Sequence, residues 1–250
     1  MDIFYIIAFF LFGVTFGSFY NVIGLRLPKD IPFHNDRSYC PSCENTLRPT
    51  ELIPIMSYVI QRGKCRYCNT RISPLYPTIE MITGLLFAFS YIKIGLQSEL
   101  AISLLFVSML VIITVSDIAY MIIPNKVLLF FLPLLVILRT IHPMDPWYNP
   151  LLGSAVGFLL IAIIIIASKG GMGAGDMKLF GVLGIILGLG KTLLTLFLAS
   201  VIGLLFGLIW MARKRIKRRQ PIPFGPFISI AALITYFYGE QMISYYLELF

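Results

Sequence analysis

Two kinds of residue in this sequence can carry chemistry by their type and spacing: paired cysteines, and acidic residues beside apolar segments. The cysteines form two C-x-x-C pairs, Cys40/Cys43 and Cys65/Cys68, with 21 residues between them. Each pair can turn two thiolates toward one ion, and two such pairs are typical of a four-cysteine zinc site. Because cysteine then fills all four ligand positions, we expect a structural Zn2+. Disulfides are the alternative, and they are rare in the cytoplasm.

Three carboxylates adjoin apolar segments: Glu80, Asp117 and Asp176. A charged side chain in or near hydrocarbon is costly, so each of them is a functional candidate. Two aspartates at one depth can share a proton, and one can then activate water while the other polarises a peptide carbonyl. This is the chemistry of aspartic proteases. From spacing alone, it is as probable that each aspartate only caps a helix or faces lipid headgroups.

A glycine-rich segment, Gly170 to Gly175, leads into Asp176. Glycines here allow close backbone approach or positive φ angles, which suits a site where a substrate backbone must come near. The segment does not match G-x-G-x-x-G, because position 176 is Asp. The later run Gly188–Thr192 ends like a phosphate-binding loop but lacks the required first glycine at Ile185. The sequence therefore predicts no nucleotide-binding loop.

The composition places these residues in a membrane protein. Of the 250 residues, 58% are hydrophobic and 13% are charged, and the mean hydropathy is +0.87. Soluble domains are about 25% charged, so an ordinary soluble enzyme is excluded. We expect an all-α polytopic membrane protein with a small cytoplasmic insert that resembles a zinc ribbon.

Eight apolar segments are candidate membrane spans, since a helix needs about 20 apolar residues to cross. The first has Asp2 where a signal peptide would be basic, so we expect it to be retained. The eight are Ile3–Leu25, Ile79–Ile92, Leu100–Ser116, Val127–Leu138, Leu151–Ala167, Met177–Gly190, Leu193–Met211 and Phe224–Gly239.

The basic residues orient these spans. When the chain crosses the membrane eight times, 17 of the 20 basic residues fall on one side, and the exceptions are Lys93, Arg139 and Lys191. The side with most basic residues should be cytoplasmic, and both termini should then lie outside. Asp117 lies 18 residues beyond Glu99, about 27 Å along a helix. Asp117 and Asp176 should then both lie at the cytoplasmic face.

The expected organisation is a first span (1–27), a zinc-binding insert (28–78) and a membrane domain (79–250). The basic cluster Arg213–Arg219 is expected to contact anionic lipid and not nucleic acid. His34 lies outside both cysteine pairs and is expected at the surface.

Several motifs, taken together and in order, resemble one family. They are Gly17–Val22 with Arg26–Pro28, the first cysteine pair, Glu51–Pro54, Arg62–Cys68, Tyr76-Pro77 with Glu80 and Thr83–Phe87, Asp117 before Ile123–Asn125, Gly173–Lys178, and Pro223–Phe227. In this order the chain resembles the type IV prepilin peptidases, which are bifunctional leader peptidases and N-methyltransferases. Leu75 departs from the pattern, because many members have a basic residue there.

The resemblance implies a GxGD-type aspartyl protease in the bacterial cytoplasmic membrane, with Asp117 and Asp176 as catalytic pair. Gly173, Gly175 and Lys178 belong to the active-site loop. The substrates implied are pilin-like precursors with a short basic leader. A second activity implied is methylation of the new N-terminus from S-adenosylmethionine, with Glu51, Gly63 and Glu80 as candidate methyltransferase or substrate-binding residues.

Other functional classes stay open on the residues alone. Membrane carboxylates can serve a proton-coupled transporter or ion channel, although transporters usually hold such charges near the midplane. A non-enzymatic adaptor would need its cysteines and not its aspartates. A general intramembrane aspartyl protease would share the pair but act on other substrates.

Overall fold

The structure is a computed structural model that describes residues 2–31, 38–168, 171–213 and 222–248. His34 and most of the basic cluster, from residue 214 on, lie outside this part of the chain. The described residues form helices and two isolated β-bridges, as expected for an all-α chain. They divide into two compact units, residues 1–115 and 116–250.

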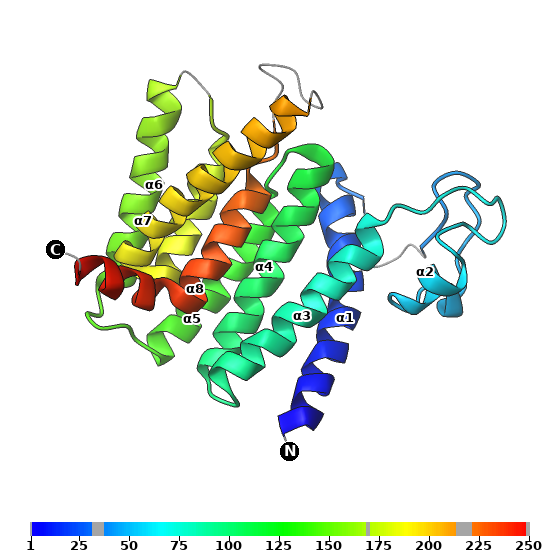
Figure 1. Cartoon of the computed structure of the whole chain (residues 1–250), viewed down its shortest axis with the longest axis horizontal. Helices are drawn as coiled ribbons and strands as arrows, with labels where there is room; N and C mark the ends of the chain where they lie inside the picture. The colour runs from blue at the N-terminus through cyan, green and yellow to red at the C-terminus, as the bar shows by residue number, and fades with distance from the viewer. Residues whose placement is uncertain (1, 32–37, 169–170, 214–221, 249–250) are drawn as a thin grey trace. The chain divides into compact units, whose positions relative to one another are not determined.

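In the first unit, helices α1 (Asp2–Arg26) and α3 (Leu75–Ile94) lie side by side (Figure 1). They approach closely because small residues face each other at the crossing. A Cβ atom on Gly13 would lie 2.7 Å from the carbonyl oxygen of Thr83. Helix α4 (Glu99–Tyr120) starts in this unit and joins α1 through a 2.6 Å hydrogen bond between Tyr20 and Ser108.

The insert between α1 and α3 contains little regular structure. It comprises two 3-10 turns, η1 (Leu27–Lys29) and η2 (Pro49–Glu51), and one short helix, α2 (Met56–Ile60). Two antiparallel β-bridges, Tyr39 with Thr46 and Lys64 with Arg71, close the loops that carry the two cysteine pairs. A segment with so few regular hydrogen bonds and so little core needs another source of stability.

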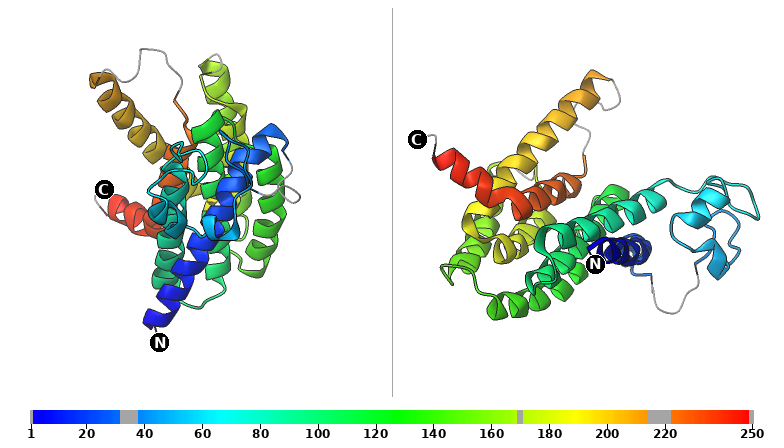
Figure 2. Two further views of the ribbon diagram at one scale, coloured as in Figure 1. Left: turned by 90° about the vertical axis from the view of Figure 1, so that its right-hand side faces the viewer. Right: turned by 60° about the horizontal axis from the view of Figure 1, so that its bottom comes forward.

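The second unit contains the end of α4 and helices α5 (Asn125–Ile141), α6 (Asn149–Ala167), α7 (Ala174–Ala212) and α8 (Gly225–Leu247). Figure 2 shows α6 and α7 from two further sides. The two helices cross with their backbones nearly in contact. A Cβ atom on Gly184 would lie only 2.2 Å from the carbonyl carbon of Gly153 and from the amide nitrogen of Ser154. Glycine is therefore required at this crossing.

Helix α7 is broken at Gly188, whose φ of 73° and ψ of 177° are not helical. The sixth and seventh predicted spans correspond to the two segments on either side of this break. Residues on both sides of Gly188 are helical, so the two helices meet at this residue without a loop between them. The chain turns within a single residue, which only glycine does readily at this φ.

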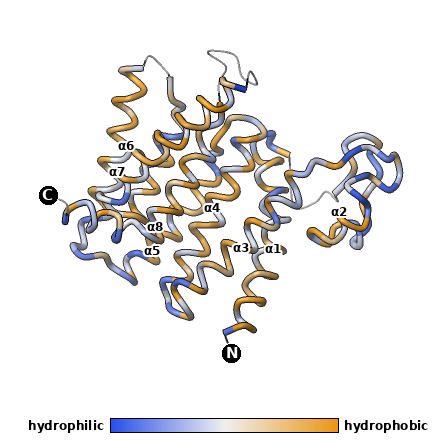
Figure 3. Tube along the Cα trace, in the orientation of Figure 1, coloured by the Kyte–Doolittle hydropathy of each residue, from blue (hydrophilic) through white to orange (hydrophobic). Residues whose placement is uncertain are grey.

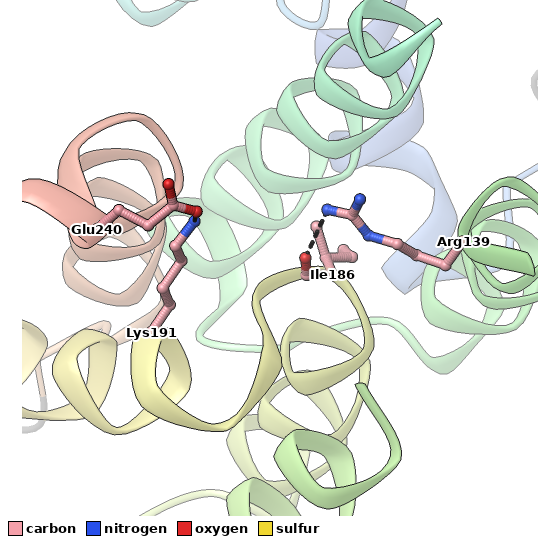
Figure 4. A network of polar contacts seen from close by, with 4 residues as sticks. All are labelled: Arg139, Ile186, Lys191 and Glu240. Atoms are coloured by element: carbon pink, nitrogen blue, oxygen red, sulfur yellow. Dashed lines mark hydrogen bonds and ion pairs between the residues drawn. The ribbon is translucent and has the colours of Figure 1, made fainter. Parts of the chain in front are cut away.

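Side chains from other helices satisfy the backbone groups on both sides of the break. Arg139 of α5 donates from Nη2 to the carbonyl oxygen of Ile186 at 2.8 Å, before the break (Figure 4). After the break, the amide of Leu189 donates to Oδ1 of Asn149 at 2.9 Å. Figure 4 also shows the 2.6 Å ion pair of Lys191 with Glu240 of α8. Helix ends need such partners because they lack intrahelical ones.

Within the described residues, five helical segments are long and apolar enough to cross a membrane. They are Asp2–Lys29, Leu75–Ile94, Glu99–Tyr120, Asn149–Ala167 and Ala174–Ala212. The chain thus has the character of a polytopic membrane protein. Helix α5 has 17 residues, and neither it nor α8 is among the five. The count of eight spans stays a prediction.

The helix crossing in the second unit gives a first testable prediction. Gly184→Ala should lower the thermal unfolding midpoint of the purified protein, because forcing a methyl group into a packed contact costs about 1–3 kcal/mol. Scanning calorimetry in detergent would measure it. Gly207→Ala in the same helix is the matched control, because its Cβ atom would lie 3.9 Å from the nearest neighbour. Equal midpoints for the two variants would contradict the close contact.

Candidate active site

Asp117 lies in the last turn of α4 and is buried, with 6% of its surface exposed. Its Oδ2 atom accepts a 2.7 Å hydrogen bond from the amide of Gly225, the first residue of α8. A Cβ atom at position 225 would lie 2.8 Å from that same oxygen. The absence of a side chain at Gly225 therefore allows the start of α8 to reach the carboxylate.

Asp176 is the third residue of α7 and is 8% exposed. Its Oδ2 accepts a 3.1 Å hydrogen bond from the amide of Gly173, so the carboxylate caps its own helix. This is part of the alternative considered above for an isolated aspartate. The neighbouring Gly175 allows a close approach, since its Cβ atom would lie 3.0 Å from the Cβ of Ile123. The described glycines of this turn do not use positive φ angles.

The two aspartates lie at the same level of the second unit. Ile123 follows α4 by three residues and contacts the first turn of α7 at Gly175. The carboxylates of Asp117 and Asp176 are near enough to interact electrostatically. Each has one oxygen held by a glycine amide, so the two side chains are fixed in position. Two buried carboxylates whose charges influence each other are placed to act together on a water molecule.

Lys178, two residues further along α7, is directed to the start of α5. Its Nζ donates a 3.0 Å hydrogen bond to Oδ1 of Asn125. This contact ties α7 to α5 beside the aspartates.

The four cysteines come together in the insert. Their sulfur atoms all lie within 4.8 Å of one another, an arrangement that could hold a metal ion. The sulfurs of Cys40 and Cys68 are 3.8 Å apart. Tetrahedral coordination at about 2.3 Å from metal to sulfur gives ligand separations of about 3.8 Å. The arrangement therefore fits one ion, and the four thiols are free of disulfides.

Hydrogen bonds lower the pKa of two of the four cysteines, Cys40 and Cys68, and so favour the thiolate, the form that binds metal. The pKa of Cys43 is raised to about 11, because desolvation and the neighbouring cysteines outweigh a backbone hydrogen bond at Asn45. A backbone hydrogen bond from Ser42 lowers the pKa of Cys40. Hydrogen bonds with the side chain and backbone of Thr70 lower the pKa of Cys68 to about 6. Ser42 lies inside the first C-x-x-C segment and Thr70 lies two residues beyond the second, so the stabilising groups are local to each pair.

The remaining candidates lie in the first unit. Glu80 is buried in α3, and its Oε2 accepts a 2.7 Å hydrogen bond from the amide of Ile55, just before α2. Glu51 is 8% exposed, and its Oε2 accepts a 2.8 Å hydrogen bond from the amide of Arg48. Its Oε1 is buried without a partner among the described residues. Gly63 has φ of 67°, and a Cβ there would lie 2.9 Å from the Tyr58 hydroxyl.

Sequence reasoning assigned no individual role to Gly225, Ile123 or Asn125, although all three occur in the quoted motifs. Gly225 contacts Asp117 across 108 residues of sequence. No local pattern in one sequence reports a contact of that range. The motif Pro223–Phe227, in which α8 begins, was the only feature of the sequence that pointed to Gly225.

Two protein-family models match the chain. The bacterial peptidase A24 N-terminal domain matches residues 11–94, and the type IV leader peptidase family matches residues 104–208. The first model thus covers the cysteine cluster, and the second covers both aspartates.

Relatives with the same description match over nearly the full length. A prepilin leader peptidase/N-methyltransferase of Bacillus subtilis (strain 168) is 44% identical over 240 residues, which cover 96% of this chain and 97% of the relative. The corresponding proteins of Aeromonas salmonicida (strain A449) and Xanthomonas campestris pv. campestris are 30% and 31% identical to this chain. The matched regions cover 92% of each relative. No solved structure matches the chain significantly.

Proposed function

We infer the function of this chain from one premise: it belongs to the type IV leader peptidase family. It is a membrane endopeptidase that removes the basic leader from pilin-like precursors. The same protein then methylates the new N-terminal residue. The buried, interacting pair of Asp117 and Asp176 is the observation that supports a peptidase chemistry. Membership of this family favours the peptidase over the transporter and adaptor hypotheses.

In the proposed mechanism, Asp117 and Asp176 act as a pair on the scissile peptide. The ionised carboxylate takes a proton from water, and the water oxygen attacks the peptide carbonyl. The protonated carboxyl group donates a hydrogen bond to the carbonyl oxygen and so stabilises the charge that develops there. The tetrahedral intermediate then breaks its C–N bond, and the leaving amine takes the proton that the first carboxylate had accepted from water. The hydrogen bonds from Gly173 and Gly225 hold the two side chains in place, which avoids reorganisation during the reaction.

Gly173 and Gly175 leave the loop before Asp176 without side chains, which would let an extended substrate backbone approach. Lys178, held by Asn125, would keep the first turn of α7 in position. A precursor would place its apolar helix in the bilayer and its basic leader in the cytoplasm. The asymmetry of basic residues supports a cytoplasmic site, a cytoplasmic insert and external termini, in the bacterial cytoplasmic membrane. We retain the division into a first span (1–27), an insert (28–78) and a protease domain (79–250).

The metal at the cysteine cluster is proposed to be Zn2+. Cys40, Cys43, Cys65 and Cys68 would hold it, and their mutual distances fit a tetrahedral site. With four thiolate ligands and no open position, the ion would serve folding of the insert and not catalysis.

The methyl donor is proposed to be S-adenosylmethionine, which when bound supplies the methyl group. Glu51 and Gly63 of the insert, with Glu80 of α3, are the candidate residues for this activity. The buried, unpartnered Oε1 of Glu51 is an acceptor able to receive a hydrogen bond from an amine. Gly63 lets the Tyr58 hydroxyl pass close to the backbone.

Both activities can be tested in one assay. The purified protein in detergent is incubated with a pilin-like precursor, with and without S-adenosylmethionine, and the product is analysed by mass spectrometry. We expect loss of the leader in both samples and one additional methyl group only with the donor. Intact precursors of several kinds, in the presence of folded protein, would contradict the proposal.

The contact between Gly225 and Asp117 gives a second prediction. Gly225→Ala should reduce leader cleavage by about 100-fold, because displacing a catalytic group by about 1 Å has an effect of that order. Gly190→Ala is the control, since its Cβ would meet its nearest neighbour at an ordinary 3.4 Å. Initial rates of leader removal would be compared. Equal rates for both variants would show that the Gly225 amide does not position Asp117.

A further inference from the structure

The segment Leu52–Ile60, which ends in the short helix α2, exposes several large apolar side chains. In Figure 3 it is the hydrophobic segment of a mostly hydrophilic loop region. Val59 and Ile60 are 64% and 72% exposed. The exposed large apolar side chains of this segment are Leu52, Ile53, Met56, Val59 and Ile60.

These side chains share one side of the segment. Within α2, Met56 precedes Val59 by three residues and Ile60 by four, which is the spacing of a single helix face. In a soluble helix such a face turns toward a core. Here it turns outward, so it requires a partner that is apolar itself.

The position of α2 identifies that partner. The insert is flanked on both sides by candidate membrane spans, Asp2–Lys29 and Leu75–Ile94. Glu80 binds the amide of Ile55 at 2.7 Å, and it lies five residues inside the second of these spans. Five residues correspond to about 7.5 Å of helix. The hydrogen bond therefore holds the start of α2 near the level of the first turns of α3, where the bilayer surface is expected.

The backbone at Ile55 supports a fixed position for α2. Its φ of 60° and ψ of −53° are unfavourable for a β-branched residue. Such a conformation persists only where the surroundings hold it. The hydrogen bond to the buried Glu80 carboxylate is a contact that does so.

The charges near α2 are complementary to anionic lipid. Between positions 48 and 71, the single acidic residue is Glu51, which is buried. The basic residues in this stretch are all exposed: Arg48, Arg62, Lys64, Arg66 and Arg71. Basic side chains beside an apolar helix face are the pattern of segments that lie in the membrane interface. A second copy of the same surface would bring like charges together.

We propose that α2 is an interfacial helix, whose apolar face enters the boundary between headgroups and acyl chains of the adjacent leaflet. Met56, Val59 and Ile60 contact lipid, and the basic residues contact lipid phosphate. The insert is thereby attached to the membrane surface by lipid contacts, in addition to its two covalent connections. This inference goes beyond the proposed function and does not depend on it.

Depth-dependent fluorescence quenching tests the proposal on the full-length protein. The protein is placed in nanodiscs of phosphatidylcholine and phosphatidylglycerol, with a genetically encoded fluorescent amino acid in place of Ile60. A second sample carries the same amino acid in place of Ser42, an exposed residue of the first cysteine loop. Lipids with a nitroxide near the top of the acyl chain are the quencher. We expect quenching at position 60 to exceed that at position 42 by at least about twofold.

Two results would overturn the proposal. Equal quenching at both positions would show that α2 lies no closer to the acyl chains than the first cysteine loop does. A blue-shifted signal at position 60 without quenching by lipid would mean that a protein surface covers the apolar face. Because neither readout uses catalysis, failure here is distinguishable from failure of the proposed peptidase activity.

Discussion

Replacing either aspartate with asparagine should abolish leader cleavage. Asp117→Asn and Asp176→Asn each keep the size of the side chain and an oxygen able to accept the glycine hydrogen bond. Each removes an ionisable group that the proposed mechanism needs for proton transfer. General acid–base catalysis contributes about 10²–10⁴-fold per group, so residual cleavage should be at most about 1% of the unmodified rate. Initial rates of leader removal, measured by mass spectrometry, would test this.

The control for both variants is Asp145→Asn, an exposed aspartate in the same unit. It makes the same change of charge and should retain normal cleavage. The thermal unfolding of all three variants should be measured as well, because loss of activity by unfolding would not test the mechanism. Near-normal cleavage by a folded Asp117→Asn or Asp176→Asn variant would rule out the catalytic pair.

Removal of the metal should unfold the insert. Structural zinc contributes about 10–16 kcal/mol of apparent binding free energy in zinc-finger peptides, and the insert has little regular structure to compensate for its loss. Cys65 is the most buried of the four cysteines, with 2% of its surface exposed. We expect Cys65→Ser to lose bound metal and to become sensitive to limited proteolysis within residues 38–73. Metal analysis and mapping of the cleavage sites would measure both effects.

Thr50→Ser is the control, because it changes an exposed residue of the same insert by one methyl group. Treatment of the unmodified protein with a chelator should reproduce the effect of Cys65→Ser, and added Zn2+ should reverse it. A protein purified under reducing conditions without metal, and with a protease-resistant insert, would contradict the zinc proposal. Wherever the metal is lost, the helices of the second unit should still resist proteolysis.

Much of the site was predictable because its determinants are local in the sequence. The cysteine cluster follows from two C-x-x-C turns, and the structure brings all four sulfurs within 4.8 Å. The limits of the apolar segments predicted Asp117 at the end of one helix and Asp176 at the start of another, and both aspartates lie there in the structure. Hydropathy and helix rise alone therefore fixed the depth at which the two aspartates were expected.

The sequence did not predict how the helix between Met177 and Met211 is built. Two apolar segments implied two spans, and the structure has two helices that meet at a kink at Gly188. The break depends on groups from other helices: Arg139 binds the carbonyl of Ile186, and Asn149 binds the amide of Leu189. Hydropathy does not report such partners, because it averages over a window and contains no information on neighbouring helices.

The sequence by itself determined the class of protein, the four cysteines that could hold a metal ion and the identity of the candidate aspartates. Each of these depends on composition or on spacing within a few residues. Only the tertiary structure decided what holds the aspartates: Asp117 by an amide 108 residues away, and Asp176 by a turn that packs on Ile123. Contacts of this range arise when helices pack against one another, and the geometry of that packing is not contained in any local segment.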